Sequence, residues 1–415
     1  INAMKEIRES KKSNPLKGIV VLDLTRVLAG PTCTQILGDL GAEIIKVERP
    51  TKGDDSRRLG PPYIKNRSNN DQESAYYLSV NRNKKSITVD ITKAEGQKLL
   101  HKLISKSDIL IENFRAGTLT NYNLSYGQLK KKFKKLIYCS VTGFGQTGPY
   151  SSRGGYDFLV QGMGGIMSVT GKATGSPTKI GVGISDIMAG MYATISILAA
   201  LRHREKTKVG QYIDIALLDS QVAWLSYIGQ NYLVSGKIPK RIGNDHPSIV
   251  PYRVFEAKNG PVILAVGNDE QFKRFCTFAK LSELHTDRRF KTNSLRVKNR
   301  KKLVEILKKV IKKYSINYWV NGLKKANVPC SPINNVREVF SDPQVKFRKM
   351  KIKMPYPYSK TGSINLIGSP IKMSDSKISY KLAPPKLGQD TEKILKKFTN
   401  LNKKQTEKLR KQKII

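Results

Sequence analysis

Asp186 stands at the start of a long apolar stretch of helical pattern, where an aspartate has two possible tasks. It follows the segment Gly-Val-Gly-Ile-Ser, and the residues after it are almost wholly apolar as far as Leu201. A helix that is apolar on most of its faces belongs in the interior of a large domain. In the first interpretation, which the local pattern favours, Ser185 or Asp186 is simply an N-cap. In the second, Asp186 is a carboxylate at the positive end of a buried helix dipole and forms covalent acyl intermediates.

Three other polar residues follow directly after apolar runs of strand type. They are Arg49, Asn113 and Arg115, and open α/β sheets bind their ligands at the carboxyl ends of strands. Any one of them is compatible with an ordinary surface position, but three of different chemistry at one edge favour a phosphate or nucleotide site. The glycine-dense segment 143–168, which contains Asp157, is either a set of plain loops or a place where backbone amides approach a ligand closely.

Cysteine and histidine are sparse and scattered, with four of each and no C-x-x-C pair, so neither a metal site nor a disulfide framework is predicted. The formal charge of +43 is extreme. Three explanations stay open: nucleic-acid binding, binding of a polyanionic small molecule such as coenzyme A, and general surface decoration. Lys-Lys pairs occur through the whole chain, for example Lys84-Lys85 and Lys403-Lys404, which favours surface decoration.

Alternating strands and helices must position these groups. Apolar runs predict strands over 18–24, 42–48, 86–91, 108–114, 136–141 and 210–218, with helices over 32–40, 94–105 and 219–236. This alternation predicts a doubly wound α/β fold with a parallel sheet and right-handed crossovers. No G-x-G-x-x-G motif occupies the first strand-to-helix turn, so a nicotinamide or flavin dinucleotide site is not predicted.

The polar segment 237–251, which carries Pro and Gly, marks the entry to a second, smaller domain. Beyond it the pattern predicts an amphipathic helix over 298–314, another over 334–340, strands and turns over 355–370, and one charged outer helix over 391–415. No uncharged apolar run reaches transmembrane length, and the N-terminal residues are polar and basic. We therefore expect a soluble, cytoplasmic protein that does not use a membrane.

Seven ordered motifs within residues 16–395 resemble the class III CoA-transferase family, the CaiB/BaiF type. They are VLDLTRVLAGP with GDLGAEIIKVE, GDDSRRLGPPY, NRNKKSITVD, DILIENFRAG, TGFGQTGPYSSRGGYD, VGISDIMAGMYA and ALRHREKTKVGQ. The later half, including HPSIVPYRVF and VPCSPINNVREVF, is especially similar to the succinate–hydroxymethylglutarate (glutarate) CoA-transferase branch.

The resemblance implies a large Rossmann-like domain built from both chain ends, a smaller α+β domain between them, and an interlocked-ring homodimer. We place the large domain's first part at 4–225, the small domain with its linkers at 226–330, and the returning segment at 331–415. The family's nucleophile falls on Asp186. Its CoA-contacting positions fall on Leu28, Ala29, Arg49, Val89, Asp90, Ile91, Thr92, Asn113, Phe114, Arg115, Arg153, Gly154, Gly155 and Tyr156.

The implied reaction moves coenzyme A from an acyl-CoA, such as succinyl-CoA, to a C4–C6 dicarboxylate, without a metal. Arg82, Arg57 and His246 are our candidates for the acceptor's far carboxylate, since arginine binds carboxylates in bidentate fashion. Each is equally suited to a structural ion pair. The family's frequent CoA-contacting cation is replaced here by Asn121, so part of the phosphate clamp must come from elsewhere. Leu28, where the formyl-CoA branch has Gln, argues against oxalate as acceptor.

Three alternatives remain. The family also contains 2-methylacyl-CoA racemases, but where those carry a histidine this chain has Tyr156, a weak base because the pKa of a phenol is about 10. A pseudo-enzyme that only binds CoA is a second alternative. A basic nucleic-acid-binding protein is the third; only the charge supports it, and we expect no nucleic-acid partner.

Overall fold

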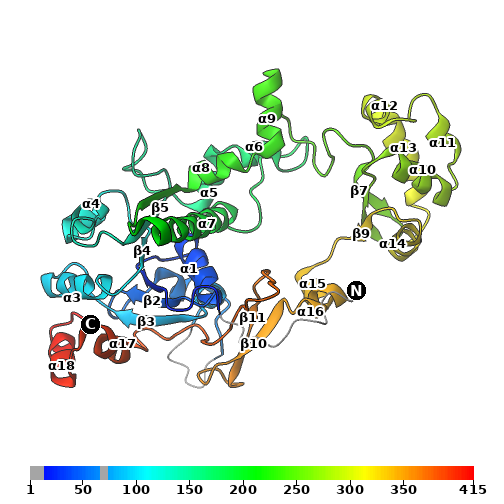
Figure 1. The fold of residues 1–415 in the computed structure, drawn as a ribbon. Coiled ribbons are helices and arrows are strands. Elements are labelled where there is room, and N and C mark those ends of the chain that lie inside the picture. The colour runs from blue at the N-terminus through cyan, green and yellow to red at the C-terminus, as the bar shows by residue number, and fades with distance from the viewer. Residues whose placement is uncertain (1–13, 66–72) are drawn as a thin grey trace. The chain divides into compact units, whose positions relative to one another are not determined.

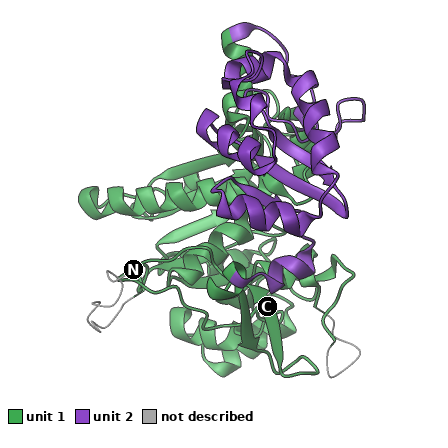
Figure 2. Ribbon diagram, turned by 90° about the vertical axis from the view of Figure 1, so that its right-hand side faces the viewer, with its two compact units in different colours: residues 1–166, 180–234, 344–415 green, residues 167–179, 235–343 purple. Residues whose placement is uncertain are grey.

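The computed structural model describes residues 14–65 and 73–415, which fall into two compact units (Figures 1 and 2). The large unit combines residues up to 166 with 180–234 and 344–415, and the small unit combines 167–179 with 235–343. The sequence placed the corresponding boundaries after residues 225 and 330. Both boundaries of the small unit therefore lie about ten residues later, and a piece of the glycine-dense region also belongs to it.

A six-stranded, wholly parallel sheet forms the centre of the large unit, which confirms the predicted α/β class. Its strand order is β3-β2-β1-β4-β5-β6, the doubly wound order whose switch point lies between β1 and β4. The strands are β1 (Val20–Asp23), β2 (Glu43–Glu48), β3 (Lys84–Thr88), β4 (Ile109–Glu112), β5 (Ile137–Thr142) and β6 (Tyr212–Ala216).

Helices cover both faces of this sheet because neighbouring residues of each strand point to opposite sides. One face packs against α1 (Ala29–Asp39) and α7 (Ile184–Thr207), and its core includes Val21, Ile109 and Ile197. The other packs against α3 (Ala94–Ile104) and α17 (Thr391–Thr399), with Leu22 and Ile394 in its core. Burying each such side chain contributes about 1.5–3 kcal/mol.

The long helix α7 crosses α1 at very close range. A Cβ atom on Gly190 would lie 2.5 Å from the carbonyl oxygen of Ala29, so only glycine fits at this crossing. By length and composition alone α7 is apolar enough to span a membrane, but half of its most apolar window is buried inside the structure. The α1–α7 contact identifies it as a core helix of the large unit, as its sequence predicted.

Smaller elements complete the large unit. They are the antiparallel hairpin β10 (Lys351–Pro355) and β11 (Ser363–Ile367), and the helices η1 (Asp55–Arg58), α2 (Ala75–Ser79), η2 (Thr118–Tyr122), α4 (Tyr126–Leu129), α5 (Asp157–Met163), α8 (Leu217–Ala223), α9 (Ser226–Ser235), α16 (Pro343–Phe347) and α18 (Lys403–Lys411). The helix α6 (Ile166–Val169) straddles a boundary between the units.

The small unit contains a three-stranded antiparallel sheet of order β7-β8-β9, made of β7 (Tyr252–Ala257), β8 (Gly260–Ala265) and β9 (Cys330–Pro332). Its helices are α10 (Asp269–Phe278), α11 (Glu283–Thr286), α12 (Asn293–Lys298), α13 (Arg300–Ile311), α14 (Ile316–Lys325) and α15 (Val336–Ser341). Phe272, Leu307 and Trp319 lie in its core, so this unit has an apolar interior of its own.

Three predicted helices were wrong in extent. The tail predicted as one helix over 391–415 is α17 followed by α18, because Asn400 adopts a left-handed conformation with φ of +57°. The segment 219–236 divides into α8 and α9 near Ser226, whose φ is +49°. The small unit's helix over 298–314 is shorter and is preceded by α12. The tail also contributes buried Ile394 and Leu395 to the sheet's core instead of lying wholly outside.

Candidate active site

Asp186 is the third residue of α7 and lies within the first helical turn. Gly183 is the N-cap, and no side chain at that position caps the helix. The interpretation of Ser185 or Asp186 as the N-cap was therefore wrong. Gly183 fits there because a Cβ atom on it would lie 2.9 Å from Leu28 Cδ2, so the first helical turn lies against the β1–α1 loop.

Asp157, on α5, supplies the missing cap from outside the helix. Its Oδ1 accepts a hydrogen bond from the backbone N–H of Ser185 at 2.8 Å, and its Oδ2 accepts one from Gln161 Nε2 at 2.8 Å. The Ser185 hydroxyl in turn donates to Gln221 Oε1 at 2.8 Å. Because Asp157 accepts the hydrogen bond of the Ser185 N–H, the Asp186 carboxylate is not needed to cap the first turn of α7.

The ionisation of Asp186 is strongly perturbed. Burial, and then the negative charge of Asp157, raise the pKa of Asp186 to about 7. Burial followed by the charge of Asp186 raises the pKa of the Tyr76 phenol, on α2, to about 12, which places this ring within electrostatic reach of the carboxylate. A poorly solvated carboxylate that is still half ionised near neutral pH is a marker of a reactive site.

A cavity of about 230 Å³, which we call the Asp186 cavity, lies beside this carboxylate within the large unit. Its walls come from the β1–α1 loop, the carboxyl end of β4, and the glycine-dense segment. The predicted residues that line it are Leu28, Ala29, Asn113, Phe114, Arg115, Arg153, Gly154, Gly155, Tyr156 and Asp186. Groups from distant parts of the chain thus meet at one edge of the sheet, near the switch point.

A second cavity of about 370 Å³, which we call the Arg49 cavity, contains the remaining predicted CoA positions. They are Arg49, Val89, Asp90, Ile91 and Thr92. Two residues, Arg26 and Phe114, line both cavities. The sequence-predicted CoA positions are therefore distributed along two cavities that share a wall.

Comparisons with known proteins show the family to which the chain belongs. The family model described as CoA-transferase family III matches residues 16–391. The chain belongs to CoA-transferase family III. The succinyl-CoA:glutarate CoA-transferase of Homo sapiens is 44% identical over 382 residues, which are 92% of this chain and 85% of that protein. The succinate–glutarate CoA-transferase of Agrobacterium fabrum is 42% identical over 393 residues, 94% of this chain and 98% of that protein.

A solved structure gives the same assignment for the fold. A CaiB/BaiF family protein from Brucella suis aligns with a TM-score of 0.83 and 44% identity, covering 93% of this chain and all of that one. The resemblance noted from the motifs is thereby confirmed, and the chain is a class III CoA-transferase with the CaiB/BaiF fold.

Two glycines of the family motif TGFGQTGPYSSRGGYD let the backbone close one wall of the Asp186 cavity. A Cβ atom on Gly143 would lie 2.5 Å from Gly155 Cα, so the two backbones touch. Next to this contact the Arg153 guanidinium lies 4.6 Å from the ring centre of Tyr150, which holds it beside the cavity. The glycines of this segment therefore serve close packing as well as ligand approach.

The structure gives Arg57 and Arg82 the ion-pair role that the sequence left open. Arg57 is buried, and its guanidinium bonds both oxygens of Glu48, at 2.8 and 2.6 Å, and Glu73 at 2.6 Å. Arg82 is also buried and bonds both oxygens of Asp39, at 2.9 and 2.5 Å. These guanidiniums already have carboxylate partners inside the chain, which argues against a second carboxylate from substrate.

His246 lies in the small unit, against the ring of Tyr252 at 5.4 Å. Its Nδ1 accepts a hydrogen bond from the backbone N–H of Ser248 at 3.1 Å. Burial and the charge of Arg300 lower its pKa, which favours the neutral ring. A role in binding substrate stays a prediction.

Sequence reasoning missed two residues near the reacting carboxylate, Arg26 and Tyr76. Arg26 lies three residues after β1, in the loop that leaves the carboxyl end of that strand, so the rule that selected Arg49 also reaches Arg26. Tyr76 comes from a short helix with no motif around it, and no local signal identifies it. Within the described residues, no group of three His, Cys, Asp or Glu side chains is placed to hold a metal ion.

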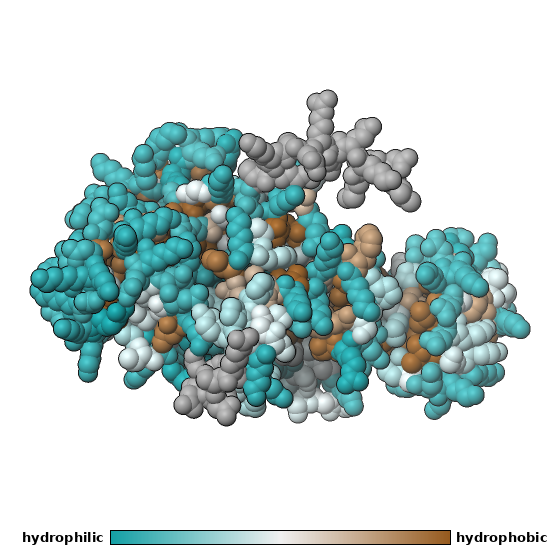
Figure 3. Space-filling model, turned by 90° about the horizontal axis from the view of Figure 1, so that it is seen from below, coloured by the Kyte–Doolittle hydropathy of each residue, from teal (hydrophilic) through white to brown (hydrophobic). Residues whose placement is uncertain are grey.

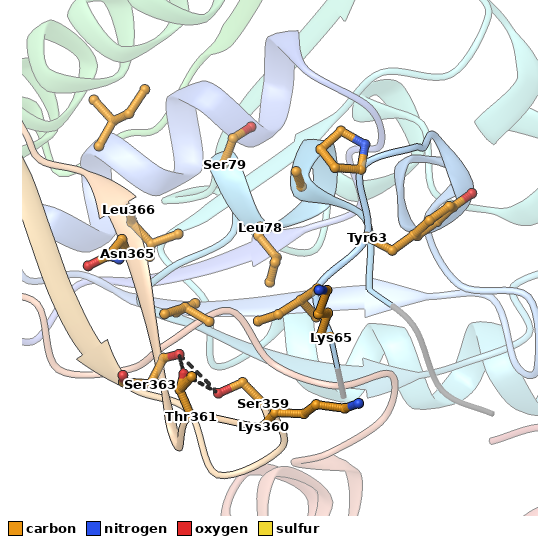
Figure 4. A pocket seen from close by; sticks show the side chains of 15 residues that line it. Tyr63, Lys65, Leu78, Ser79, Ser359, Lys360, Thr361, Ser363, Asn365 and Leu366 are labelled. Atoms are coloured by element: carbon orange, nitrogen blue, oxygen red, sulfur yellow. Dashed lines mark hydrogen bonds between the residues drawn. The ribbon is translucent and has the colours of Figure 1, made fainter. Parts of the chain in front are cut away.

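A further cavity of about 570 Å³ lies elsewhere on the large unit, between the loop 62–65, α2 and the hairpin β10–β11 (Figure 4). Its walls are mainly apolar, with Leu78 and Leu366 facing inward. Ser359 and Thr361 both donate to the carbonyl of Ser363 at 2.9 Å. None of the predicted nucleophilic or CoA-contacting residues lines this cavity.

Proposed function

We propose that this protein transfers coenzyme A from succinyl-CoA to glutarate or a related C4–C6 dicarboxylate, with Asp186 as the nucleophile. The observation that carries the proposal is the half-buried Asp186 carboxylate, whose pKa is raised to about 7 by desolvation and by Asp157, at the wall of a cavity lined by the motifs that resemble the family's CoA-binding motifs. The names of the human and Agrobacterium relatives support the choice of donor and acceptor.

In the first half-reaction an Asp186 oxygen attacks the thioester carbonyl of succinyl-CoA, and the C–S bond breaks. The products are a succinyl–aspartyl anhydride and the CoA thiolate. The thiolate then attacks the aspartyl carbonyl of the anhydride, which releases succinate and leaves an aspartyl-CoA thioester. One difficult exchange is thereby divided into two easier ones.

In the second half-reaction the acceptor carboxylate attacks the aspartyl-CoA thioester and expels the thiolate again. The thiolate attacks the acceptor's carbonyl in the new anhydride, forming the product acyl-CoA and restoring the Asp186 carboxylate. Each step forms and breaks one acyl bond, and no water enters the balance. The glycine-rich segment that lines the cavity at Gly154 and Gly155 offers backbone N–H groups for the developing oxyanions.

The mechanism requires CoA to stay bound while its thiolate leaves and returns. The two cavities support this, because the thioester has room beside Asp186 while the nucleotide occupies the Arg49 cavity. Basic and glycine-rich walls suit the phosphates and the amide-bearing arm of the cofactor. Coenzyme A is in our proposal a substrate, and no metal takes part.

We also propose an interlocked homodimer, soluble and cytoplasmic. Apolar side chains on the large unit lack cover, which supports an extensive protein interface. On α7 they recur at helical spacing as Met191, Ile195 and Leu198, and on α5 and α9 they include Phe158, Leu159, Met163, Tyr227, Tyr232, Leu233 and Val234. Tagged and untagged dimers that exchange subunits in native buffer would contradict interlocking; hybrids should form only after unfolding and refolding.

The surface charge does not require a nucleic-acid partner in our proposal. On the face seen in Figure 3, hydrophilic side chains spread over most of the surface and are not gathered in one stripe. The protein should therefore give no gel shift with duplex DNA at moderate salt. A shift that weakens steeply with added salt would instead support nucleic-acid binding.

Mass spectrometry of acyl-CoAs tests the proposed reaction directly. The protein is mixed with succinyl-CoA and a panel of dicarboxylates, and we expect glutaryl-CoA together with an equal amount of free succinate. With ¹⁸O-labelled glutarate, one label should pass into the peptide that contains Asp186. Exchange without label in that peptide would overturn the aspartyl route, and epimerisation of 2-methylacyl-CoA without exchange would replace the proposal by the racemase alternative.

A further inference from the structure

Arg26 occupies the junction between the two cavities. It lines both of them, as Phe114 does, and its guanidinium lies 5.3 Å from the centre of the Phe114 ring. The Arg26 Nη1 atom pairs with Asp55 Oδ2 at 3.1 Å, in a setting where both side chains are partly exposed. Such a half-exposed ion pair holds the cation loosely and leaves it accessible to a stronger anion.

The backbone of Arg26 is fixed on both sides by one side chain. Asn113 Oδ1 accepts from the Arg26 N–H at 3.0 Å, and Asn113 Nδ2 donates to the Arg26 carbonyl at 2.8 Å. The next N–H, that of Val27, donates to Asp54 Oδ1 at 3.1 Å, and Val27 has a φ of +70°. A β-branched residue adopts this conformation only where its surroundings impose it.

The buried lysine Lys46 completes the support of this loop. Its Nζ donates to the carbonyl of Thr25 at 2.9 Å and to Asp54 Oδ2 at 2.8 Å, and its side chain is wholly buried. Side chains from several elements thus hold the backbone from Thr25 to Val27. The loop therefore fixes the backbone from which the Arg26 side chain reaches the junction, and no reordering of that backbone is needed on binding.

One hydrogen-bond donor of Arg26 has no partner. Its Nε–H is buried and makes no hydrogen bond with any of the described residues. A buried donor without a partner is costly, so an acceptor oxygen that reached the Arg26 Nε–H would gain a hydrogen bond at no loss of another within the chain.

We propose that Arg26 binds the diphosphate of coenzyme A at this junction. The inference rests on the proposed function, which puts the CoA sulfur beside Asp186. The chemical order of CoA is thiol, pantetheine arm, diphosphate and adenosine 3′-phosphate. With the thiol in the Asp186 cavity and the nucleotide in the Arg49 cavity, the diphosphate must pass the junction. Arginine matches phosphate oxygens through Nε and Nη together.

This assignment also accounts for the departure at Asn121. The family often has a CoA-contacting cation there, whereas Asn121 lies exposed on η2 and carries no charge. Arg26 supplies a permanent cation between the cavities instead. Binding of the diphosphate would release Asp55 from its ion pair, since phosphate oxygens compete for the same guanidinium.

Calorimetric titration with three ligands tests the assignment. Coenzyme A, dephospho-CoA and pantetheine are titrated into the wild-type protein and the Arg26→Gln, Arg26→Lys and Arg58→Gln variants. Arg58 is a matched control, because it pairs with the same Asp55 at 3.3 Å but lines neither cavity. We expect Arg26→Gln to raise the Kd of CoA and of dephospho-CoA by the same factor, about tenfold to a hundredfold.

Arg26→Lys should give a smaller rise, because lysine keeps the charge and loses the Nε donor. Arg58→Gln should bind all three ligands with the Kd values of the wild-type protein. In turnover assays Arg26→Gln should raise KM for succinyl-CoA far more than it lowers kcat, and its thermal melting should stay close to that of the wild type. The backbone hydrogen bonds to Asn113 and Asp54 do not depend on this side chain, so the variant should fold.

The outcomes separate this inference from the proposed function. Unchanged CoA binding by Arg26→Gln overturns the assignment and leaves the function standing. If Arg26→Gln weakens the binding of CoA but not of dephospho-CoA, Arg26 contacts the 3′-phosphate. If it weakens the binding of pantetheine by the same factor, Arg26 contacts the pantetheine arm. Either result overturns the diphosphate contact. Wild-type protein that binds CoA but transfers none contradicts the function alone, while wild-type protein that binds no CoA contradicts both.

Discussion

Two carboxylates of the large unit, the buried Asp54 and the half-buried, largely desolvated Asp186, have opposite electrostatics. Burial opposes the ionisation of Asp54, but the charge and hydrogen bond of Lys46 outweigh it, so the pKa of Asp54 lies below its usual range. Burial of Asp186 is reinforced by Asp157, and its pKa rises to about 7. A buried carboxylate that is paired with a cation, such as Asp54, stabilises the fold. A desolvated carboxylate without a cation, such as Asp186, lowers the stability of the fold but is a marker of a reactive site.

The arginines divide in the same way. Arg57 and Arg82 are buried and paired inside the chain, Arg57 with Glu48 and Glu73 and Arg82 with Asp39, so they hold segments of the chain together. Arg26 and Arg115 line cavities, and neither has a buried carboxylate partner among the described residues. The partners of a charged side chain, and not its type, therefore separate the groups that support the fold from those that meet a ligand.

Replacing Asp186 should give the largest effect. Asp186→Asn keeps the shape of the side chain but removes the nucleophile, so CoA exchange should fall by at least about a thousandfold. The variant should also be more stable than the wild type at pH 8, since the buried charge is gone. Exchange is measured by mass spectrometry and stability by urea unfolding.

Asp375→Asn is the matched control, because Asp375 is exposed and lines neither cavity. It should keep full activity and wild-type stability. Normal turnover by Asp186→Asn would show that the Asp186 carboxylate is not the nucleophile. A raised carboxylate pKa would then not distinguish a reactive group from a structural one such as Asp54.

Removing the cation of the compensated pair should cost stability. In Lys46→Met the Asp54 carboxylate, whose side chain is wholly buried, loses its partner, and unfolding free energy should fall by about 3–5 kcal/mol. The double variant Lys46→Met/Asp54→Asn should recover part of that loss, because no bare charge remains. Chemical denaturation measures both.

An exposed ion pair provides the comparison. The side chains of Arg202 and Glu205 are 70% and 66% exposed, so Arg202→Met should change stability by less than about 1 kcal/mol. Equal losses for Lys46→Met and Arg202→Met would contradict the view that burial makes the Lys46–Asp54 pair essential.

The sequence predicted the sheet well because buried parallel strands are short, nearly continuous apolar runs that stand out from their surroundings. The edge where ligands bind followed from the same pattern, so Arg49 and Asn113 could be named in advance. Helix ends were harder. Asn400 is a residue type that favours the left-handed backbone that ends α17, whereas nothing in the local sequence of Ser226 requires the left-handed backbone at the start of α9.

The partners of buried charges were beyond sequence reasoning. The carboxylates that pair with Arg57 come from β2 and from the segment before α2, and only the folded chain brings them to one point. Capping of α7 by Asp157 is equally non-local. Arg26 is different, since its place in the loop after β1 is a signal that the sequence itself carries.

The close crossing of α1 and α7 should be sensitive to a single methyl group. In Gly190→Ala the new Cβ would lie 2.5 Å from the Ala29 carbonyl oxygen and 2.9 Å from Thr32 Cβ. The helices must separate, which should cost about 1–3 kcal/mol. Because Ala29 and Asp186 line the same cavity, kcat should fall too. Gly127→Ala, in α4 with open space around it, should leave stability and activity unchanged.

The smallest expected effect is a shift of the pH profile. Asp186 reacts as the anion, so the rate should fall about tenfold per pH unit below its pKa of about 7 and level off above it. Asp157→Asn removes the neighbouring negative charge and keeps an oxygen for the Ser185 N–H. Burial, the larger cause, is unchanged, so the profile should move to lower pH by less than about one unit.

The raised pKa of Asp186 also makes the stability of the fold depend on pH. A carboxyl group whose pKa is higher in the folded than in the unfolded chain takes up protons on folding, so stability falls as pH rises between about 4 and 7. Asp157→Asn lowers the folded pKa of Asp186 and should flatten that decline, which urea unfolding at pH 5 and pH 8 measures. A profile that stays in place or moves to higher pH would mean that Asp157 acts on Asp186 only by capping α7, and that burial alone keeps the carboxylate reactive.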